Sequence, residues 1–298
     1  MKSNSIASAA FAASLGLLAL PAQALLITYN GFASSAGLTT VGNAAFVNTG
    51  GADGTVLRVT PAAGSQAGAA YSTNAVTLGT NATFSTTFQF RFTNPGGIDP
   101  ADGITFILAA GTTGLGLGGG GIGIQGVANS VAIEFDNYNN GGIDGNSSNH
   151  VGLDINGNVG SNPLANVYGI ATCDFGPFTS YTEPGCMANG NLWSVTIAYD
   201  GNTLTASLTD PAMGSSFQAL NVANLDIGAI LGTNSAFVGF TSGTGGGFMN
   251  HDIVNWSFAN DLQLVDPNRI PEPGSLALLG VAMGALGMVR RRRLTAGR

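Results

Sequence analysis

A short stretch in the middle of the sequence concentrates side chains that can bind a cation. The run VAIEFD, which ends at Asp136, alternates apolar and acidic residues and predicts a β-strand with Glu134 and Asp136 on one face. Burying two adjacent carboxylates is unfavourable unless a cation neutralises them. Asn140, Asp144 and His150 follow closely and add oxygen and imidazole ligands. We therefore predict a metal-binding loop; the alternative is that these groups decorate a solvated face and turn.

The candidate ligands divide into two sets according to donor chemistry. An all-oxygen set suits Ca²⁺, whereas a set with an imidazole nitrogen suits Mn²⁺ or a similar transition ion. The calcium set comprises Asp136, the Tyr138 carbonyl, the Asn140 amide oxygen and Asp144. The transition-metal set comprises Glu134, Asp136, Asp144 and His150. In this hypothesis Asp136 and Asp144 bridge the two ions.

Strands, not helices, are expected to position these ligands. Apolar residues almost never recur at helical spacing, whereas alternation and runs of Val, Ile, Phe and Thr recur between clusters of Gly, Asn and Ser. The 46 glycines fall mostly in those clusters and are interpreted as turns. The expected strands are residues 83–92, 103–109, 130–135, 150–156, 193–199, 203–209, 236–241 and 251–258. This pattern predicts an all-β fold, an antiparallel sandwich.

Charge and length narrow the class of protein. Residues 25–266 contain two bases, Arg58 and Arg91, against 15 carboxylates, which gives a formal charge of −13. Nucleic-acid binding is excluded, because there is no basic surface to neutralise phosphates. A sandwich of roughly 240 residues is commonly one domain, so we expect a single domain over this range.

The N-terminus has the composition of a signal peptide, predicted here as residues 1–24. Lys2 provides a positive charge, residues 6–20 are apolar, and Ala-Gln-Ala at 22–24 fits a signal-peptidase site. The alternative is a membrane anchor or an ordinary helix, but the apolar run is shorter than the ~20 residues that span a bilayer. Export would allow the only two cysteines, Cys173 and Cys186, to form a structural disulfide.

The C-terminal segment, residues 267–298, has three successive features. Pro-Glu-Pro at 271–273 precedes an apolar stretch at 275–289, and four arginines follow at 290–293. An apolar helix of about 22 Å falls short of ~30 Å of hydrocarbon, and the arginines would keep its end cytoplasmic.

This tail resembles the PEP-CTERM sorting signal. The resemblance implies a Gram-negative host that makes exopolysaccharide and an exosortase-type processing enzyme. We expect a transient inner-membrane (transmembrane) intermediate, followed by a cell-surface or extracellular form. The alternative is a plain short anchor.

The cation-binding stretch resembles the legume-lectin (L-type lectin) family, whose loop reads VAVEFDTxxN, then Asp, then HIGID. Here the residues are VAIEFDNYNN, then Asp144, then HVGLD, with Asp144 about one position from where some members place it. Further matching runs are YNGF (29–32), TFSTTF (83–88), ADGITFIL (101–108), GGGGIGI (118–124), LWSVTIAYDGNTLTASL (192–208), VGFTSGTGG (238–246) and HDIVNWSF (251–258). The resemblance implies a concanavalin-like β-sandwich, or jelly roll, that binds a glycan or exopolysaccharide.

The resemblance also implies a sugar site. Asp102 would accept hydrogen bonds from sugar hydroxyls after a cis Ala101–Asp102 bond, and Gly120 would donate its backbone N–H. Asn140 would hold calcium through its oxygen and the sugar through its NH₂, and Tyr138 would offer an aromatic face. The remaining predicted contacts are Gly246 and Gly247 of the specificity loop; these offer only backbone groups, which leaves selectivity weak or dependent on Phe248 or Asn250.

Three other interpretations concern nucleotide binding, glycoside hydrolysis and a catalytic His-Asp pair. The run GIGIQG at 121–126 fits a dinucleotide pattern, but a strand rather than a helix is expected after it. A glycosidase of the laminarinase type needs ExDxxE, and Asn139 stands where the second Glu would be. His251 and Asp252 begin the run HDIVNWSF, which matches a structural strand of the family rather than a catalytic motif. We therefore predict no catalytic residues, and the remaining alternative is a structural matrix protein that has lost sugar binding.

Overall fold

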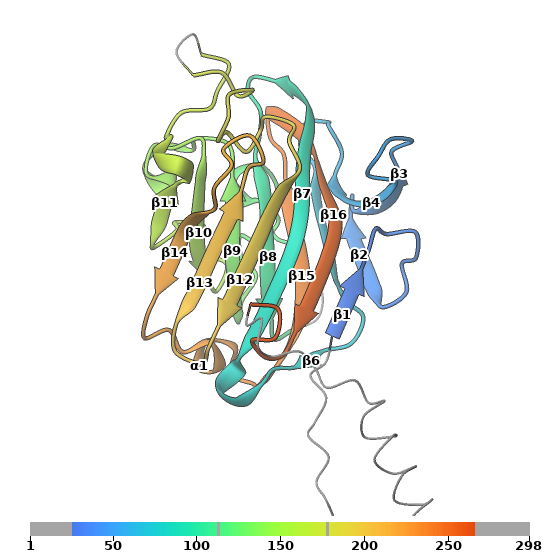
Figure 1. Ribbon diagram of the computed structural model, residues 1–298, viewed down its shortest axis with the longest axis vertical. Helices are drawn as coiled ribbons and strands as arrows, with labels where there is room; N and C mark the ends of the chain where they lie inside the picture. The colour runs from blue at the N-terminus through green and yellow to red at the C-terminus, as the bar shows by residue number, and fades with distance from the viewer. Residues whose placement is uncertain (1–25, 112–113, 177–178, 266–298) are drawn as a thin grey trace, which may run out of the picture.

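The computed structural model describes residues 26–111, 114–176 and 179–265, which form two facing β-sheets (Figure 1). The predicted signal peptide and the predicted sorting segment lie outside these residues. Within the described part of the chain, no helix is both long and apolar enough to cross a bilayer.

The first sheet has eight strands. They are β1 (Leu26–Tyr29), β3 (Ala45–Asn48), β4 (Thr55–Thr60), β7 (Phe84–Gly97), β12 (Trp193–Tyr199), β13 (Leu204–Thr209), β14 (Phe217–Val222) and β16 (Gly247–Ala259). Their order is β14-β13-β12-β7-β16-β4-β3, and β1 pairs with β16.

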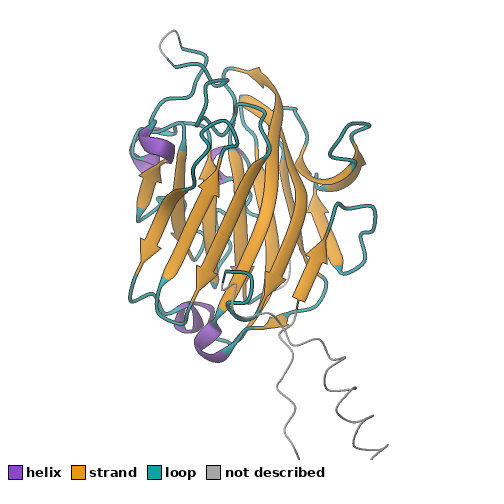
Figure 2. Cartoon of the chain, in the orientation of Figure 1, coloured by secondary structure: helices purple, strands orange, loops and turns teal. Residues whose placement is uncertain are grey.

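The second sheet also has eight strands. They are β2 (Leu38–Gly42), β5 (Ala67–Ser72), β6 (Val76–Thr77), β8 (Gly103–Ala109), β9 (Ser130–Asp136), β10 (His150–Ile155), β11 (Leu164–Asn166) and β15 (Ser235–Gly243). Their order is β11-β10-β9-β8-β15-β5-β2, and β6 pairs with β15. The pairings in both sheets are antiparallel. A short helix, α1 (Ile227–Leu231), lies between β14 of the first sheet and β15 of the second. Figure 2 shows two layers of strands with a few short helices at their edges, and the two antiparallel sheets confirm the predicted all-β sandwich.

The eight predicted strands are all present, two of them with the predicted bounds. Strands β7 and β16 extend past their predicted ends, because they pair with each other up to Gly97 and Gly247. The sequence did not predict this extension, because Asn-Pro-Gly-Gly at the end of β7 has the composition of a turn. The strands missed were β1–β6, β11 and β14, which are short or rich in Ala, Gly and Thr.

Aromatic side chains fill the space between the sheets. Period-two alternation in β7 turns Phe88 and Phe90 inward and leaves Thr87 and Gln89 on the outer face. Phe88 lies near the centre of the cluster, with ring centroids 5.0 Å from Phe240 in an edge-on arrangement. Burial of large aromatic surface is the main stabilising contribution here.

Strand β9 is buried on both faces. Val131, Ile133 and Phe135 face the main core, as the alternation predicted, whereas Ala132 belongs to a second apolar cluster. That second cluster includes Ile122, Ile124 and Val127, which belong to the loop between β8 and β9. We call residues 110–111 and 114–129, the described part of this loop, the glycine-rich loop; its apolar residues pack against the outer face of the second sheet. Glu134 and Asp136 are buried although they point away from the core: Ser161, in the loop after β10, contacts Glu134, and the Tyr138 N–H, in the loop after β9, donates to Asp136.

Phe88→Ala should lower the free energy of unfolding by about 3–5 kcal/mol, because it removes a fully buried ring from the centre of the core. Chemical denaturation followed by tryptophan fluorescence measures this change. The matched control is Thr87→Ala, the next residue on the outer face, which should change stability by less than about 0.5 kcal/mol. Equal effects of the two substitutions would contradict the assigned faces.

Candidate functional site

Strand pairing brings three of the predicted metal ligands together. In the β9–β10 register His150 lies opposite Asp136, and Gly152 lies opposite Glu134. One ligand atom from each of Glu134, Asp136 and His150 lies within 4.8 Å of the others, and all three side chains are buried. The glycine at 152 leaves room for the Glu134 carboxylate, since a Cβ there would lie 2.7 Å from its Oε1.

The hydrogen bonds of His150 leave a lone pair facing a carboxylate. Its Nδ1 lies 3.2 Å from the Ser147 carbonyl oxygen, which can only accept, so Nδ1 carries the proton. Its Nε2 then presents a lone pair 3.0 Å from Glu134 Oε1. Burial lowers the pKa of His150 and raises that of Glu134 to about 7. Two acceptors in contact need a proton or a metal ion between them.

The loop after β9 folds back onto the same cluster. The Asp136 carboxylate accepts a hydrogen bond from the Tyr138 backbone N–H at 2.7 Å, and Asp144 accepts one from the Asn140 N–H. A 3-10 turn, Gly141–Asp144, ends at Asp144 and leaves its side chain buried. Burial raises the pKa of Asp136, and the nearby charges of Glu134 and Asp144 raise it further.

No basic side chain of the described residues neutralises these acids. Arg58 forms an ion pair with Asp252 at 2.7 Å, and Arg91 forms one with Asp53 at 2.7 Å. The sequence has no other Lys or Arg between positions 26 and 265. Mutually repelling buried carboxylates without a counter-charge fit a divalent cation, and the mixed oxygen and nitrogen donors fit the two predicted classes of ion.

Two residues of this cluster were missed in the sequence. Asp154 is fully buried, and Ser161 Oγ contacts both its Oδ1, at 2.9 Å, and Glu134. One hydroxyl proton cannot satisfy two carboxylates, and the pKa of Asp154 is raised to about 9 by burial and by Glu134. The same alternation could have identified Asp154, since it shares the face of His150 on β10. Ser161 gives no such signal, because it lies in a loop.

The predicted sugar residues converge beside the acids. The Asp102 side chain is 3% exposed, and its Oδ2 has no hydrogen-bond partner. A Cβ on Gly120 would lie 2.5–2.7 Å from the Asn140 amide atoms, so the two residues are in contact. A Cβ on Gly245 would lie 3.7 Å from Asp102 Oδ2 and 3.5 Å from the Gly119 Cα. The glycine loop, the 245 turn and Asp102 therefore lie close together at one edge of the sandwich.

The backbone at Asp102 has the implied conformation. The Ala101–Asp102 peptide bond is cis, and the Asp102 carbonyl accepts a hydrogen bond from the Asn137 N–H at 2.8 Å. Burial raises the pKa of Asp102 to about 7; the nearby Gly245 backbone N–H opposes this rise, and the Asp144 charge adds to it. The side chain of Tyr138 is partly exposed at the edge of the cluster.

The specificity loop differs from the expectation. Gly246 is exposed, but Gly247 is buried at the start of β16, where a Cβ would lie 2.3 Å from the Asp99 carbonyl oxygen. Asn250 cannot supply selectivity as suggested, because it is buried and its Oδ1 accepts a hydrogen bond from the Ala62 N–H at 2.7 Å. Phe248 packs flat against Gly96 in the neighbouring strand.

His251 and Asp252 do not form a catalytic pair. The His251 ring is fully buried, with Nδ1 2.8 Å from Thr60 Oγ1, and burial lowers its pKa to about 3. The Asp252 carboxylate is held by the Arg58 guanidinium. These successive strand residues thus have different structural partners.

Cys173 and Cys186 are joined by a disulfide, and both are buried. Phe175, two residues into the segment they enclose, donates its backbone N–H to Asp99 Oδ1 at 2.9 Å. This hydrogen bond ties the described start of the disulfide-closed segment to the loop that precedes Asp102.

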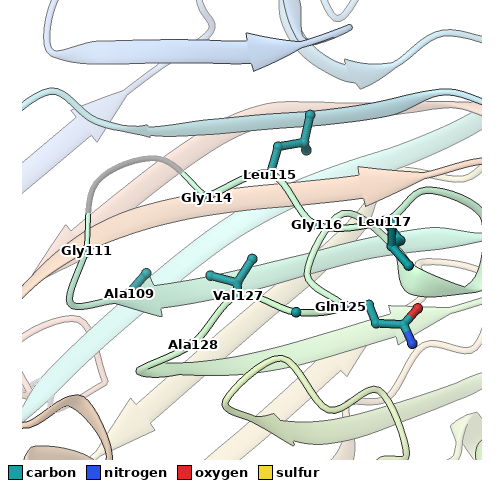
Figure 3. A pocket seen from close by; sticks show the side chains of 10 residues that line it. Ala109, Gly111, Gly114, Leu115, Gly116, Leu117, Gln125, Val127 and Ala128 are labelled. Carbon is teal, nitrogen blue, oxygen red and sulfur yellow. The ribbon is translucent and has the colours of Figure 1, made fainter.

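A cavity of about 340 Å³ lies elsewhere, under the glycine-rich loop beside β8 and β9 (Figure 3). None of the predicted site residues lines it. Its lining contains no charged side chain and comprises Ala109, Gly111, Gly114, Leu115, Gly116, Leu117, Gln125, Gly126, Val127 and Ala128. The GIGIQG run adjoins it and leads into β9, without the helix that a dinucleotide site needs.

Comparisons with known proteins agree with the β-sandwich fold. The lectin alpha chain of Lablab purpureus is 32% identical over 219 residues, which are 68% of this chain and 70% of that protein. Pisum sativum lectin is 29% identical over 198 residues, 62% of this chain, and the match spans only 64% of the pea protein. A solved structure of basic winged bean lectin with Tn-antigen has a TM-score of 0.63 at 26% identity, covering 80% of this chain and 98% of that one.

Two family descriptions match separate parts of the sequence. The PEP-CTERM protein-sorting motif matches residues 269–293, which confirms the resemblance of the tail. The legume lectin domain matches residues 24–273, nearly the whole chain apart from its two ends, and the chain therefore belongs to the legume lectin domain family.

Proposed function

We propose that this protein binds a glycan through Asp102, Gly120, Tyr138 and Asn140, at a site organised by calcium and a second divalent ion. The observation that carries the proposal is the unpartnered, buried Asp102 Oδ2 beside a cluster of carboxylates that no arginine neutralises. A buried acceptor of this kind is suited to a sugar hydroxyl donor. Gly246 lies at the exposed edge of this site, and Gly247 is buried next to it at the start of β16.

The proposed ligand sets remain those read from the sequence. Calcium would be held by Asp136, the Tyr138 carbonyl, Asn140 and Asp144, and manganese or a similar ion by Glu134, Asp136, Asp144 and His150. The ions supply positive charge that neutralises the buried acids. Ser161, itself hydrogen-bonded to Asp154, would then help to orient Glu134, because its hydroxyl contacts Oε1, the oxygen that faces His150 Nε2.

The two sugar-contacting polar groups have complementary roles. The Asp102 carboxylate would accept hydrogen bonds from two hydroxyls, and the Asn140 NH₂ would donate one. The contact between Gly120 and Asn140 explains the absence of a side chain at position 120, since a Cβ would collide with the amide. Recognition in this proposal therefore depends on the loop conformation that the ions stabilise.

The site is proposed to act in binding alone. The sequence places Asn139 where a glycosidase of this shape needs its acid, and the similar proteins are lectins. The sorting tail supports export, processing by an exosortase and a surface location, where the partner would be a glycan or the host's own exopolysaccharide.

The metal-free protein should lose stability as the pH rises from about 4 to 7. The folded-state pKa of Asp102 and Glu134 is about 7, above the unfolded value, so the folded chain holds protons that the unfolded chain releases in this window. Calcium or manganese alone, at a hundredfold excess over Kd, should raise Tm at pH 7.5 by about 5–10 °C. At pH 5 the rise should be smaller, because protons compete with the ions.

Differential scanning calorimetry after chelation, with each metal restored in turn, measures this effect. Asp136→Asn is the control, because it removes a carboxylate common to both sets and should abolish most of the metal response. An unchanged melting curve at pH 7.5, with no metal in the purified protein, would rule out the proposed ions.

Asp102→Ala and Asn140→Ala should each weaken glycan binding by about 1–3 kcal/mol, since each removes a polar partner of the sugar. Asn140→Ala should also lower calcium affinity, and Asp102→Ala should do so less. A glycan array with and without calcium identifies the ligand, and calorimetry on the best sugar gives the affinities. Asn221→Ala, an exposed residue of β14, is the matched control and should bind normally. Full binding by Asp102→Ala would place the sugar elsewhere.

Replacing Arg290, Arg291, Arg292 and Arg293 with Gln should reduce retention in the inner membrane and missort the protein, without changing glycan binding. In the wild type, mass spectrometry of the surface or extracellular form should find a new C-terminus near residues 271–273. Recovery of the chain through Arg298 in that fraction would favour a plain anchor over a processed sorting signal.

A further inference from the structure

We propose that the Cys173–Cys186 disulfide positions the metal-binding loop, so that full affinity for the transition ion arises only once the two thiols have been oxidised after export. This regulation rests on the proposed function, since it acts on the proposed transition-ion set. The structural basis is the bend at residues 147–149, which contacts the chain on both sides of the disulfide and leads directly into His150. The residues between the two cysteines take no part.

The first contact of the bend is with the segment that ends at Cys173. The Ser148 N–H donates to the Ala171 carbonyl oxygen at 2.8 Å, and the Cys173 N–H donates to Ser148 Oγ at 2.9 Å. The Ser147 hydroxyl also donates to the Ala171 carbonyl, at 3.2 Å. Both serines are buried, where low polarity strengthens hydrogen bonds. The bend is therefore paired with residues 171–173.

The second contact of the bend is with the residues that flank Cys186. Asn149 is fully buried, and its Nδ2 donates to the Gly185 carbonyl oxygen at 2.9 Å. Its Oδ1 accepts a hydrogen bond from the Met187 N–H at 3.0 Å. One amide side chain thus holds the residues before and after Cys186, which is bonded to Cys173. The bend, the two segments and the covalent bond between them form a closed clamp.

The clamp fixes the direction of the histidine that is proposed to bind the metal. The Ser147 carbonyl accepts the proton of His150 Nδ1 at 3.2 Å, and Nε2 then lies 3.0 Å from Glu134 Oε1. Ser147 is held in turn, because its Oγ accepts the Asn149 N–H at 3.1 Å. Outer hydrogen bonds of this kind set the tautomer and orientation of an imidazole ligand, and their loss typically weakens metal binding by about 10- to 100-fold.

The proposed calcium set depends less on the clamp. Its ligands lie between Asp136 and Asp144, before the bend, and the Asp144 carboxylate is held by the Asn140 N–H. The Ser147 N–H joins this stretch to the bend through the Asp144 carbonyl oxygen, at 3.1 Å. Loss of the disulfide should therefore change the preference between the two ions, which a general loss of stability would not do.

The bond itself depends on the compartment. Its formation transfers two electrons and two protons from the thiols to a disulfide-bearing oxidant, which is reduced to two thiols. Such oxidants act on exported proteins, whereas cytosolic thiols stay reduced. Cys173 and Cys186 are fully buried in the folded chain, so the oxidant must reach them before the fold closes. A chain that still awaits export would lack the clamp and would bind the transition ion weakly.

The fold around the clamp has other support, which makes the bond removable. The Gly185 N–H donates to Asp210 Oδ2 at 2.8 Å, and Asn189 Nδ2 donates to the same oxygen at 2.7 Å. Asp210 directly follows β13 in the first sheet. Without the disulfide, residues 185–189 should stay attached to the sheet while their tie to residues 171–173 is loosened.

The test compares the affinities of the two ions, each added alone to the exported wild-type protein and its variants. Electron paramagnetic resonance of free Mn²⁺ and calorimetry with Ca²⁺ give the two dissociation constants. We expect Cys173→Ala with Cys186→Ala to weaken Mn²⁺ binding by about tenfold or more and Ca²⁺ binding by less than about threefold. Asn149→Ala, which keeps the disulfide, should shift the ratio in the same direction. Wild-type protein refolded with oxidised glutathione should bind Mn²⁺ more tightly than the same protein refolded with a reducing phosphine.

The matched control is Phe258→Leu, which trims a buried ring near the end of β16, whereas the bend precedes β10 in the other sheet. It should lower Tm and leave the ratio of the two dissociation constants unchanged. An unchanged ratio in the double-cysteine variant or in Asn149→Ala would overturn the clamp and leave the proposed metal site standing. If the double variant does not fold, the two refolded wild-type samples give the same comparison. Failure of oxidised wild-type protein to bind either ion would refute both proposals.

Discussion

The structure depends on how it accommodates buried carboxylates that no basic side chain balances. Asp102, Glu134, Asp136, Asp144 and Asp154 are each at most 3% exposed, while both arginines of the sandwich are paired elsewhere. In a medium of low polarity, such a group of acids is stable only if protons or cations offset the charge. The raised pKa values describe the proton-bound form, and the proposed ions would replace those protons. Local stability and ligand recognition are thereby linked.

The sandwich makes this arrangement possible because its second sheet is covered on both sides. Aromatic residues fill one face, and the glycine-rich loop with its own apolar cluster covers the other. The acids on the outward face of β9 are buried beneath the loops that follow β9 and β10, which supply the Tyr138 N–H to Asp136 and the Ser161 hydroxyl to Glu134. Glycines at 120 and 152 let polar side chains approach the backbone more closely than a Cβ would permit. The glycine-rich loop carries Gly120, which contacts Asn140 in the proposed sugar site.

The edge around Asp102 combines residues that match the family with a turn that supplies few side chains. Asp102 and Gly120 match the family, whereas the specificity turn contributes mainly glycine backbone. Gly246 of that turn is exposed, and Gly247 is buried at the start of β16. Selectivity in the proposed function therefore depends on backbone groups and on the conformation of loops outside the sheets, which can vary without disturbing the core.

The sequence by itself determined the features that depend on neighbouring residues. Alternation placed Glu134 and Asp136 on one face of a strand and predicted β8 and β12 with their observed bounds, because side-chain direction in a strand has a period of two. Family resemblance supplied Asp102 and Gly120 as candidates. Only the tertiary structure decided which distant groups meet: Ser161 with Glu134, Asn250 with Ala62, and Phe175 with Asp99, 76 residues away. Those contacts depend on strand pairing and loop packing, which no local pattern encodes.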